Sequence, residues 1–394
     1  MLIGLVGKAN TGKSTFFKAL TLAEVAIAPY PFTTLAPNEG IGFVKTTCVE
    51  KEFKTKCKPK HGYCLQANRF VPVKVIDVAG LVPGAHKGKG RGNQFLDDLR
   101  EADILIHILD ASGRTDAEGK PTEGYDVCYD IRFLQEEIDL WFYAVIGKNW
   151  GVYAREQEKG EKLSKILAEK LSGLHVNEEM IKKAMKKLNL SEFASEWNDT
   201  QLLEFVMQLR KESKPIVIAA NKADLPEAAS NIKKLRKEFP DLLIIPCSAE
   251  TELALREAAR DNLISYMPGS DKFEILQEEK LNEQQKKALS FIKNYLEKHE
   301  NTGVQQCLNA AVFDFLHYIV VYPVENEKHL TDKDGNILPD AFLLPQQSTA
   351  LDLAYTVHTD IGNSFIAAID ARTKKRLAKD YQLKDKDIIR IMTR

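Results

Sequence analysis

The stretch that most constrains this chain is GKANTGKS at residues 7–14, which fills every fixed position of the phosphate-binding pattern G-x-x-x-x-G-K-S/T. It follows an apolar run at residues 2–6 and precedes an amphipathic stretch at residues 15–20. This order predicts a loop between a buried parallel strand and a helix, whose N-terminal amides hold phosphate oxygens. The candidate nucleotide-binding residues of this loop are Gly7, Lys8, Ala9, Asn10, Thr11, Gly12, Lys13, Ser14 and Thr15.

Two later segments are predicted to sense Mg²⁺ and a γ-phosphate. The proline-punctuated segment 29–38 is interpreted as a loop, in which Thr34 reaches Mg²⁺ only when a γ-phosphate is present. The predicted strand 71–78 leads into a D-x-x-G pattern, where Asp77 acts on the metal and the Gly80 amide contacts the γ-phosphate. The candidate catalytic residues are Lys13, Thr34 and Gly80, and the candidate metal ligands are Ser14, Thr34 and Asp77.

The segment at residues 81–93 is rich in glycine and basic residues and is predicted to be a second switch loop. Leu81 stands where many nucleotide hydrolases carry a glutamine that positions water, so we expect slow intrinsic hydrolysis. His86 could orient the water instead, although a surface histidine is the simpler interpretation.

The base-recognition pattern N-K-x-D follows a predicted strand within residues 214–224. The Asp224 carboxylate can accept hydrogen bonds from N1–H and the 2-amino group of guanine, a donor pair that adenine lacks. Asn221 is expected to tie this loop to the phosphate-binding loop, and the Lys222 stem to cover one face of the base. The pattern therefore predicts a guanine nucleotide.

Two further apolar runs, residues 104–110 and 242–246, are predicted to be buried strands. The second run leads into Cys247, and the backbone amides of Ser248 and Ala249 are candidates for reading guanine O6. The order and spacing of all these elements make a chance assembly improbable.

Composition excludes several classes of protein. The chain has 394 residues, of which 44% are hydrophobic. Its 55 basic residues are balanced by 56 acidic residues, so we do not expect a protein that coats nucleic acid with a uniformly basic surface. It lacks both an apolar run of ~20 residues and the features of a signal peptide, which predicts a cytoplasmic protein with no membrane partner. Six cysteines are too few for a disulfide scaffold at this length.

About a hundred residues separate the predicted strand ending at Asp110 from the next one, so an insertion is expected there. Within it, leucines and other apolar residues recur at helical spacing, which indicates helices packed on one another. The predicted domains are a G domain (residues 1–125 and 212–266), a helical insertion (126–211), a helical connector (267–317) and a C-terminal domain (318–394).

The C-terminal domain has a small β-grasp pattern. Predicted strands at residues 319–322, 365–369 and 388–392 accompany a predicted helix at residues 350–359. Residues 371–394 contain nine Lys or Arg and three Asp, a local charge of +6 (9 − 3). This patch favours RNA, and a solvated basic surface is the alternative.

A short basic stretch contains Cys48, Cys57, His61 and Cys64. The spacing C-x8-C-x3-H-x2-C corresponds to none of the established zinc patterns. A zinc site, free thiols and a disulfide are therefore three open interpretations.

The chain resembles translation-factor-related GTPases of the Obg superfamily, and within it the YchF branch. The resemblance rests on GKANTGKS, PFTTLAPNEG, DVAGLVPGAHKGKGRGNQFLDDLREAD, NKAD, LLPQQSTALDLAYTVHTDIGNSFIAAIDA and LKDKDIIRI. It implies a C-terminal TGS domain, a β-grasp module, and a helical insertion that serves as a partner-binding arm. YchF proper has lost N-K-x-D and resembles an ATP-binding protein, whereas residues 221–224 are intact here. Asn10 matches an asparagine that coordinates K⁺ in several relatives, so K⁺ stimulation is a hypothesis.

These inferences together predict an α/β fold: a P-loop NTPase with a Ras-like G domain, a helical insertion and a C-terminal β-grasp (TGS) domain. We expect it to bind GTP and GDP with Mg²⁺ and to hydrolyse GTP slowly to GDP and phosphate, as a conformational switch. The ribosome or RNA is the expected partner through the TGS domain, and no DNA partner is expected. Two alternatives stay open: a nucleotide-gated RNA-binding module with negligible turnover, and a YchF-like ATPase.

Overall fold

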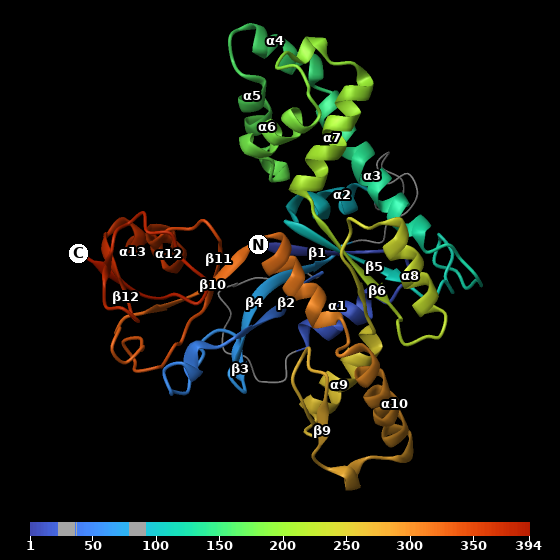
Figure 1. Ribbon diagram of the computed structural model, residues 1–394, viewed down its shortest axis with the longest axis vertical. Coiled ribbons are helices and arrows are strands. Elements are labelled where there is room, and N and C mark those ends of the chain that lie inside the picture. Colours follow the sequence, from blue (N-terminus) through green and yellow to red (C-terminus); the bar gives the residue numbers. More distant parts are fainter. Residues whose placement is uncertain (23–35, 37, 79–91) are drawn as a thin grey trace. The chain divides into compact units, whose positions relative to one another are not determined.

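The computed structural model describes residues 1–22, 36, 38–78 and 92–394 (Figure 1). Thr34 and Gly80 lie outside these residues, as do Leu81 and His86. The chain divides into two compact units. The first unit comprises Met1–Lys18, Lys74–Thr251 and Thr302–Cys307, and the second comprises Ala19–Val73, Glu252–Asn301 and Leu308–Arg394.

The first unit contains parallel strands in the order β4-β1-β5-β6-β7. These strands are β1 (Leu2–Val6), the end of β4 (Asn68–Asp77), β5 (Ile104–Asp110), β6 (Ile216–Asn221) and β7 (Ile244–Pro246). Every residue of β5 and β6 is buried, which explains why both read as continuous apolar runs. The predicted strand at residues 104–110 is confirmed with the same bounds.

The register of these strands brings their carboxyl ends to one edge. Leu5 of β1 lies opposite Asp77 of β4, and Asp110 of β5 lies opposite Asn221 of β6. Ligands of open parallel sheets bind at this edge. The loops that follow β1, β5, β6 and β7 therefore start at the same edge as the end of β4, where the sequence motifs occur.

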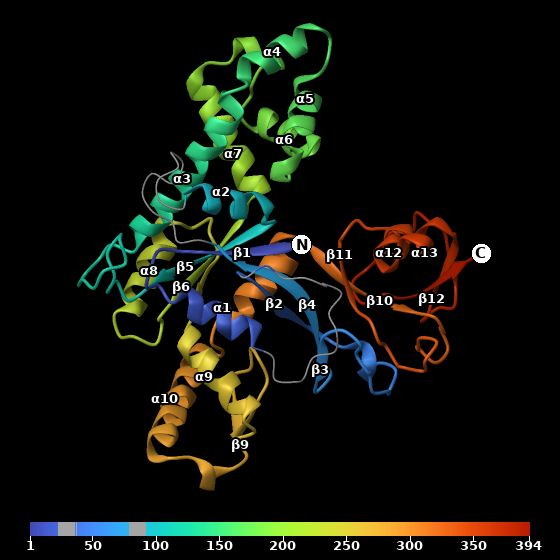
Figure 2. The ribbon, with the colours of Figure 1, turned by 180° about the vertical axis from the view of Figure 1, so that it is seen from behind.

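Helices complete the first unit. Helices α3 and α7 pack together, and a buried ion pair joins Arg210 of α7 to Asp139 of α3 at 2.8 Å. Figures 1 and 2 both show α4, α5 and α6 gathered at the ends of α3 and α7 that lie away from the strands. The helices that lie wholly in this unit are α2 (Gly92–Glu101), α3 (Cys128–Gly147), α4 (Trp150–Glu158), α5 (Leu163–Lys170), η3 (Ser172–Leu174), α6 (Glu178–Lys187), η4 (Ala194–Glu196), α7 (Asp199–Ser213) and α8 (Ala228–Glu238).

Among the described helices, three run from one unit into the other along the chain. They are α1 (Lys13–Thr21), α9 (Ala249–Arg260) and α11 (Val304–Asn309). Helix α11 ends at Asn309, and a π-helical turn, η6 (Ala310–Phe315), follows it within the predicted helical connector.

The C-terminal part of the second unit is a mixed sheet in the order β11-β10-β14-β12-β13, with parallel pairing between β10 and β14. Its apolar face packs on α12, where Leu353 and Ala354 are fully buried. The predicted helix 350–359 ends earlier than expected, because His358 is extended (φ −166°, ψ 142°) and caps a second helix. The elements are β10 (Tyr318–Val324), β11 (Phe342–Pro345), α12 (Ala350–Val357), α13 (Thr359–Asn363), β12 (Phe365–Asp370), β13 (Arg376–Leu377) and β14 (Ile388–Thr393).

The rest of the second unit includes a tight hairpin between β3 and the start of β4. Gln66 and Ala67 both have positive φ, at 47° and 59°, as a two-residue type I′ turn requires. The remaining elements are β2 (Glu39–Thr47), η1 (Val49–Lys51), β3 (Tyr63–Leu65), β8 (Ile264–Tyr266), β9 (Phe273–Ile275), η5 (Glu278–Lys280) and α10 (Glu283–His299).

Among the described helices, none is both long enough and apolar enough to cross a membrane. The P-loop α/β fold with a C-terminal β-grasp domain is confirmed. The domain limits given above stay a prediction.

Candidate nucleotide-binding site

The two fixed glycines of the phosphate-binding loop are required by the local geometry. A Cβ atom on Gly7 would lie 2.4 Å from the carbonyl oxygen of Ile108, and one on Gly12 would lie 2.4 Å from Nδ2 of Asn221. Gly12 also has a φ of +89°, which L side chains disfavour. The loop can therefore approach both β5 and Asn221 only because these positions lack a side chain.

Helix α1 begins directly at this loop. Its first turn contains no acidic residue, and the amide of Phe16 donates to the carbonyl of Gly12 at 2.9 Å. Ser14 is exposed in this first turn and Thr15 is half-buried, whereas Thr11 is fully buried and donates to the Lys8 carbonyl at 3.2 Å. The helix N-terminus thus presents amides and a partial positive charge beside an exposed hydroxyl.

Lys13 contacts the end of β4. Its ammonium forms an ion pair with Asp77 Oδ1 and donates to the Val78 carbonyl at 2.7 Å. Asp77 lies opposite Leu5, so its carboxylate ends its strand next to the start of the phosphate-binding loop. A hydroxyl at Ser14 and a carboxylate at Asp77 are the oxygen donors that Mg²⁺ prefers, so the donor set fits this metal.

Asn221 links the loops that follow three different strands. Its Nδ2 donates to the Thr11 carbonyl at 2.8 Å, and its Oδ1 accepts from the Ala249 amide at 2.9 Å. The side chain is 3% exposed, so both bonds are shielded from water. Asn221 therefore fixes the loop after β6 against both the phosphate-binding loop and the loop after β7.

Lys222 extends across the same edge. Its ammonium lies 2.9 Å from the Asn10 carbonyl and 2.8 Å from Oδ2 of Asp110, the last residue of β5. Burial alone would raise the pKa of Asp110, but hydrogen bonds from Lys222, Ser112 and Thr115 outweigh it and lower the pKa below its ordinary value. Asp110 was not among the predicted site residues. Its position could have indicated it, because a polar residue at the carboxyl end of a buried parallel strand is a candidate site residue.

Asp224 is half-buried, and its carboxylate has no hydrogen bond or ion pair with any residue in the described part of the chain. The amides of Ser248 and Ala249 both take part in tertiary contacts. The Ser248 amide donates to the Thr302 carbonyl at 2.9 Å, and the Ala249 amide donates to Asn221 Oδ1. A role of these two amides in reading guanine O6 stays a prediction.

The loop between β5 and α3 covers one side of the phosphate-binding loop. Asn10, which has a φ of 61°, donates through Nδ2 to the Gly119 carbonyl at 2.9 Å. Gly119 has a φ of +80°, and a Cβ there would lie 2.5 Å from the Ala9 carbonyl oxygen. The exposed residues Ala9 and Asn10 are thus supported from a segment about 110 residues away in sequence.

Lys8 of the phosphate-binding loop contacts three residues of the segment between β5 and the first turn of α3. Its ammonium donates to the Thr115 carbonyl at 2.9 Å, lies 2.9 Å from Asp130 Oδ2 and stands 3.8 Å from the centroid of the Tyr125 ring. Burial and the charge of Lys8 lower the pKa of neighbouring His107 to about 3, so this imidazole is neutral at pH 7. Neither Asp130 nor His107 was predicted, because their distance from the motif in sequence leaves no local signal.

Some of the basic side chains in the C-terminal segment at residues 371–394 form ion pairs within the protein. Arg372 forms two hydrogen bonds with Glu52, at 2.7 and 2.8 Å, and Arg390 lies 2.8 Å from Glu327. Exposed basic residues with no ion pair in the described part of the chain remain, including Lys375, Arg376 and Lys379.

The residues that cluster in the cysteine stretch are not the four that the sequence suggested, Cys48, Cys57, His61 and Cys64. The sulfur atoms of Cys48, Cys57 and Cys64 come together, but His61 does not join them, since its Nε2 lies 3.8 Å from Asp340 Oδ1. Glu50 takes the fourth position.

Three family models match the chain. One described as 50S ribosome-binding GTPase matches residues 2–134, and one described as Obg-like GTPase YGR210-like, G4 motif-containing domain, matches residues 219–326. A model of the TGS domain matches residues 328–393.

Several curated proteins are similar to this chain, one of them over its whole length. An uncharacterized GTP-binding protein of Methanocaldococcus jannaschii is 52% identical over 392 residues, covering 100% of this chain and 99% of that protein. A second GTP-binding protein, from Schizosaccharomyces pombe, is 37% identical over 362 residues, covering 89% of this chain and 88% of that protein. More distantly, the protein named ribosome-binding ATPase YchF of Mycoplasma pneumoniae is 35% identical over 201 residues, covering 48% of this chain and 52% of that protein.

The fold is also that of a solved relative. The crystal structure of a GTP-binding protein from Pyrococcus horikoshii has a TM-score of 0.79 and 40% sequence identity, and the match covers 100% of both chains. The chain belongs to the Obg-like, YchF-type family of GTP-binding proteins, which combine a P-loop G domain with a C-terminal TGS domain.

Proposed function

We propose that this chain binds GTP and GDP with Mg²⁺ and hydrolyses GTP slowly, as a conformational switch. The observation that carries the proposal is the Asn221 side chain, which bonds to Thr11 on one side and to Ala249 on the other. It fixes the N-K-x-D loop beside the phosphate-binding loop. Asp224, three residues along, then offers an unengaged carboxylate to the N1–H and 2-amino group of guanine.

The phosphates would lie over the N-terminus of α1, where the amides of residues 7–15 and the Lys13 ammonium meet them. Lys13 would leave Asp77 to reach the β- and γ-phosphates, which frees the Asp77 carboxylate. Ser14, Thr34 and Asp77 would then hold Mg²⁺, Asp77 through water, and the metal would neutralise charge on the phosphate oxygens.

Hydrolysis is proposed to be slow because Leu81 stands where a water-positioning glutamine is common. Lys13, the Thr34 switch residue and the Gly80 amide would stabilise the charge that develops on the transferred phosphoryl group. K⁺ is a second candidate cation. The Asn10 amide nitrogen is engaged by Gly119, which leaves the amide oxygen as a possible ligand.

The ribosome or its RNA is the proposed partner, and the cytoplasm the proposed location. This rests on the name of the family model matched by residues 2–134, on the ribosome-binding YchF relative, and on the exposed basic residues of the TGS domain. The name of that relative, an ATPase, keeps ATP as the alternative nucleotide. Intact Asp224 favours GTP.

Equilibrium binding of GTP, GDP and ATP in Mg²⁺ tests the base assignment. The native chain should prefer guanine nucleotides, and Asp224→Ala should abolish that preference. Asp241→Ala is the matched control, since this aspartate is exposed in a loop before β7. Equal affinity of the native chain for GTP and ATP would contradict the assignment.

Single-turnover GTP hydrolysis, with and without purified ribosomal subunits, tests the switch. We expect slow turnover alone and acceleration by ribosomes. Absence of acceleration would favour a nucleotide-gated RNA-binding module instead. The same assay in KCl and NaCl tests the role of K⁺, with Asn10→Ala expected to remove any K⁺ stimulation.

A further inference from the structure

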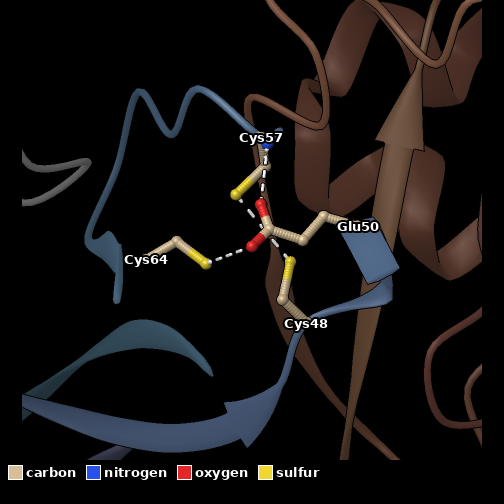
Figure 3. A group of neighbouring side chains, drawn as sticks. All are labelled: Cys48, Glu50, Cys57 and Cys64. Carbon is tan, nitrogen blue, oxygen red and sulfur yellow. Dashed lines mark hydrogen bonds between the residues drawn. The ribbon is translucent and has the colours of Figure 1, made fainter. Parts of the chain in front are cut away.

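Three cysteines and a glutamate of the second unit form a compact group outside the nucleotide site. One ligand-type atom from each of Cys48, Glu50, Cys57 and Cys64 lies within 4.8 Å of all the others. The Cys48 and Cys57 sulfurs are 3.8 Å apart, and the Cys64 sulfur lies 3.7 Å from Glu50 Oε1. Figure 3 shows the four side chains converging from different parts of the segment at residues 48–64.

The S···S distance of 3.8 Å and the S···O distance of 3.7 Å match those of a tetrahedral zinc site. With Zn–S bonds of about 2.3 Å and a Zn–O bond of about 2.1 Å, a regular tetrahedron has S···S edges of about 3.8 Å and S···O edges of about 3.6 Å. A disulfide requires sulfurs about 2.05 Å apart, and none of these cysteines is disulfide-bonded here. The thiols are therefore spaced for a shared ligand rather than for a covalent bond.

The backbone holds each ligand in place. Cys48 directly follows β2 and its amide donates to Ala67 at 2.9 Å, Glu50 lies in η1, and Cys64 lies in β3. The Cys57 amide donates to Glu50 Oε2 at 2.8 Å. This bond orients the carboxylate so that its other oxygen faces the thiols, which is how outer partners orient the ligands of protein metal sites.

The charge of the group also favours a cation. Cys48 and Cys57 are buried, and Glu50 is half-buried with no ion pair among the described residues. A carboxylate removed from water beside three thiols is unfavourable unless a positive charge compensates it. Sulfur-rich sites with four protein ligands select zinc and serve structure rather than catalysis. We propose that Cys48, Glu50, Cys57 and Cys64 bind one structural zinc ion.

The zinc would brace the loop at residues 48–64, which touches the C-terminal part of the second unit. The amides of Lys58 and Lys60 donate to the carbonyls of Ile337 and Pro339, each at 2.8 Å. The Lys60 ammonium lies 2.5 Å from Asp332. Few apolar residues of this loop are buried. A bound metal would therefore hold the loop in one conformation, as a hydrophobic core does in other parts of the protein.

Metal analysis of the purified full chain tests the proposal without any substitution. We expect one zinc ion per chain, measured by inductively coupled plasma mass spectrometry. Cys57→Ser should lose it, whereas Cys128→Ser, a buried cysteine outside the group, and His61→Ala should retain it. Glu50→Gln replaces a charged ligand by a neutral one and should weaken the affinity for added Zn²⁺ by at least the roughly 10-fold that loss of an outer partner costs, measured against a competing chelator.

A second measurement reports the ligand set directly. After removal of the metal, Co²⁺ should bind and give the thiolate-to-cobalt charge-transfer absorption of three cysteine ligands, and this band should decrease in Cys57→Ser. A wild-type chain that neither contains zinc nor binds added Zn²⁺ or Co²⁺ overturns the proposal. So does a disulfide between two of these cysteines in the folded protein, and so does a loss of zinc affinity in His61→Ala with none in Glu50→Gln.

Discussion

The Lys8 ammonium lies 2.9 Å from Oδ2 of Asp130, and each of the two side chains is 6% exposed. Lys8 belongs to the phosphate-binding loop, and Asp130 to the first turn of α3, the helix that leads into the helical insertion. A buried charge pair therefore joins the loop that holds the nucleotide to the start of the insertion. Rearrangement of the loop on nucleotide exchange would have to be accommodated by α3.

Asp130→Asn should lower the free energy of unfolding by about 3–5 kcal/mol, because it leaves the Lys8 ammonium buried without a carboxylate. The double variant Lys8→Met with Asp130→Leu should recover most of this loss. Urea unfolding measures both. Asp126→Asn is the control, since this exposed aspartate also pairs with lysine and arginine but should change stability by only about 0–1 kcal/mol. Equal stability of the two single variants would contradict the prediction.

Gly119→Ala should weaken GTP binding, whereas Gly124→Ala in the same loop should not. Both glycines have positive φ, at +80° and +68°, so both variants carry a similar backbone cost of about 1–2 kcal/mol. Only at Gly119 would the new Cβ meet another backbone, at 2.5 Å from the Ala9 carbonyl oxygen. Overpacking there should displace the phosphate-binding loop and reduce affinity roughly tenfold or more. Similar affinities of the two variants would show that this contact does not shape the site.

Asn221→Asp should reduce the affinities for GTP and GDP together while the preference over ATP persists. The new carboxylate still accepts from the Ala249 amide but cannot donate to the Thr11 carbonyl. Loss of this buried bond should cost about 1–3 kcal/mol. Asp224, which is proposed to choose the base, is unchanged. Isothermal calorimetry with the three nucleotides measures the effect, and loss of the guanine preference would assign base recognition to Asn221 instead.

His107 should make stability decline in acid. Burial and the charge of Lys8 lower its pKa to about 3, whereas the unfolded imidazole titrates near 6.5. Between pH 6.5 and pH 3 the unfolded state therefore binds a proton at His107 that the folded state does not bind. The contribution of His107 to the free energy of unfolding is complete above pH 6.5 and is lost as the pH falls toward 3. His107→Gln should reduce the slope of unfolding free energy against pH by up to about 1.4 kcal/mol per pH unit in this range. Parallel pH profiles of the two proteins would contradict this origin.

Much of the fold could be predicted from the sequence because its signals are local. The run at residues 104–110 is apolar except for His107 and Asp110, and the structure buries it as β5 with the same bounds. The helix expected at residues 350–359 is instead interrupted at His358, whose side chain caps the N-terminus of α13. The apolar pattern did not indicate this interruption, because a capping residue can separate two helices without changing the spacing of the apolar residues.

The cysteine group illustrates the opposite case. The sequence offered His61 as the fourth candidate because histidine is a frequent zinc ligand and lies between two of the cysteines. The fold instead directs His61 toward Asp340 and brings Glu50 to the sulfurs, where the Cys57 amide holds it. Side-chain direction in an irregular loop depends on φ and ψ values that residue spacing does not specify.

The linear order of residues was enough to identify the phosphate-binding loop, the N-K-x-D loop and the strands that carry them, because each depends on neighbours along the chain. Folding was needed to pair Lys8 with Asp130 and Lys222 with Asp110, which are 122 and 112 residues apart. It was also needed to engage the amides of Ser248 and Ala249. Contacts of this kind arise where parallel strands end at one edge, and no local pattern records which side chains meet there.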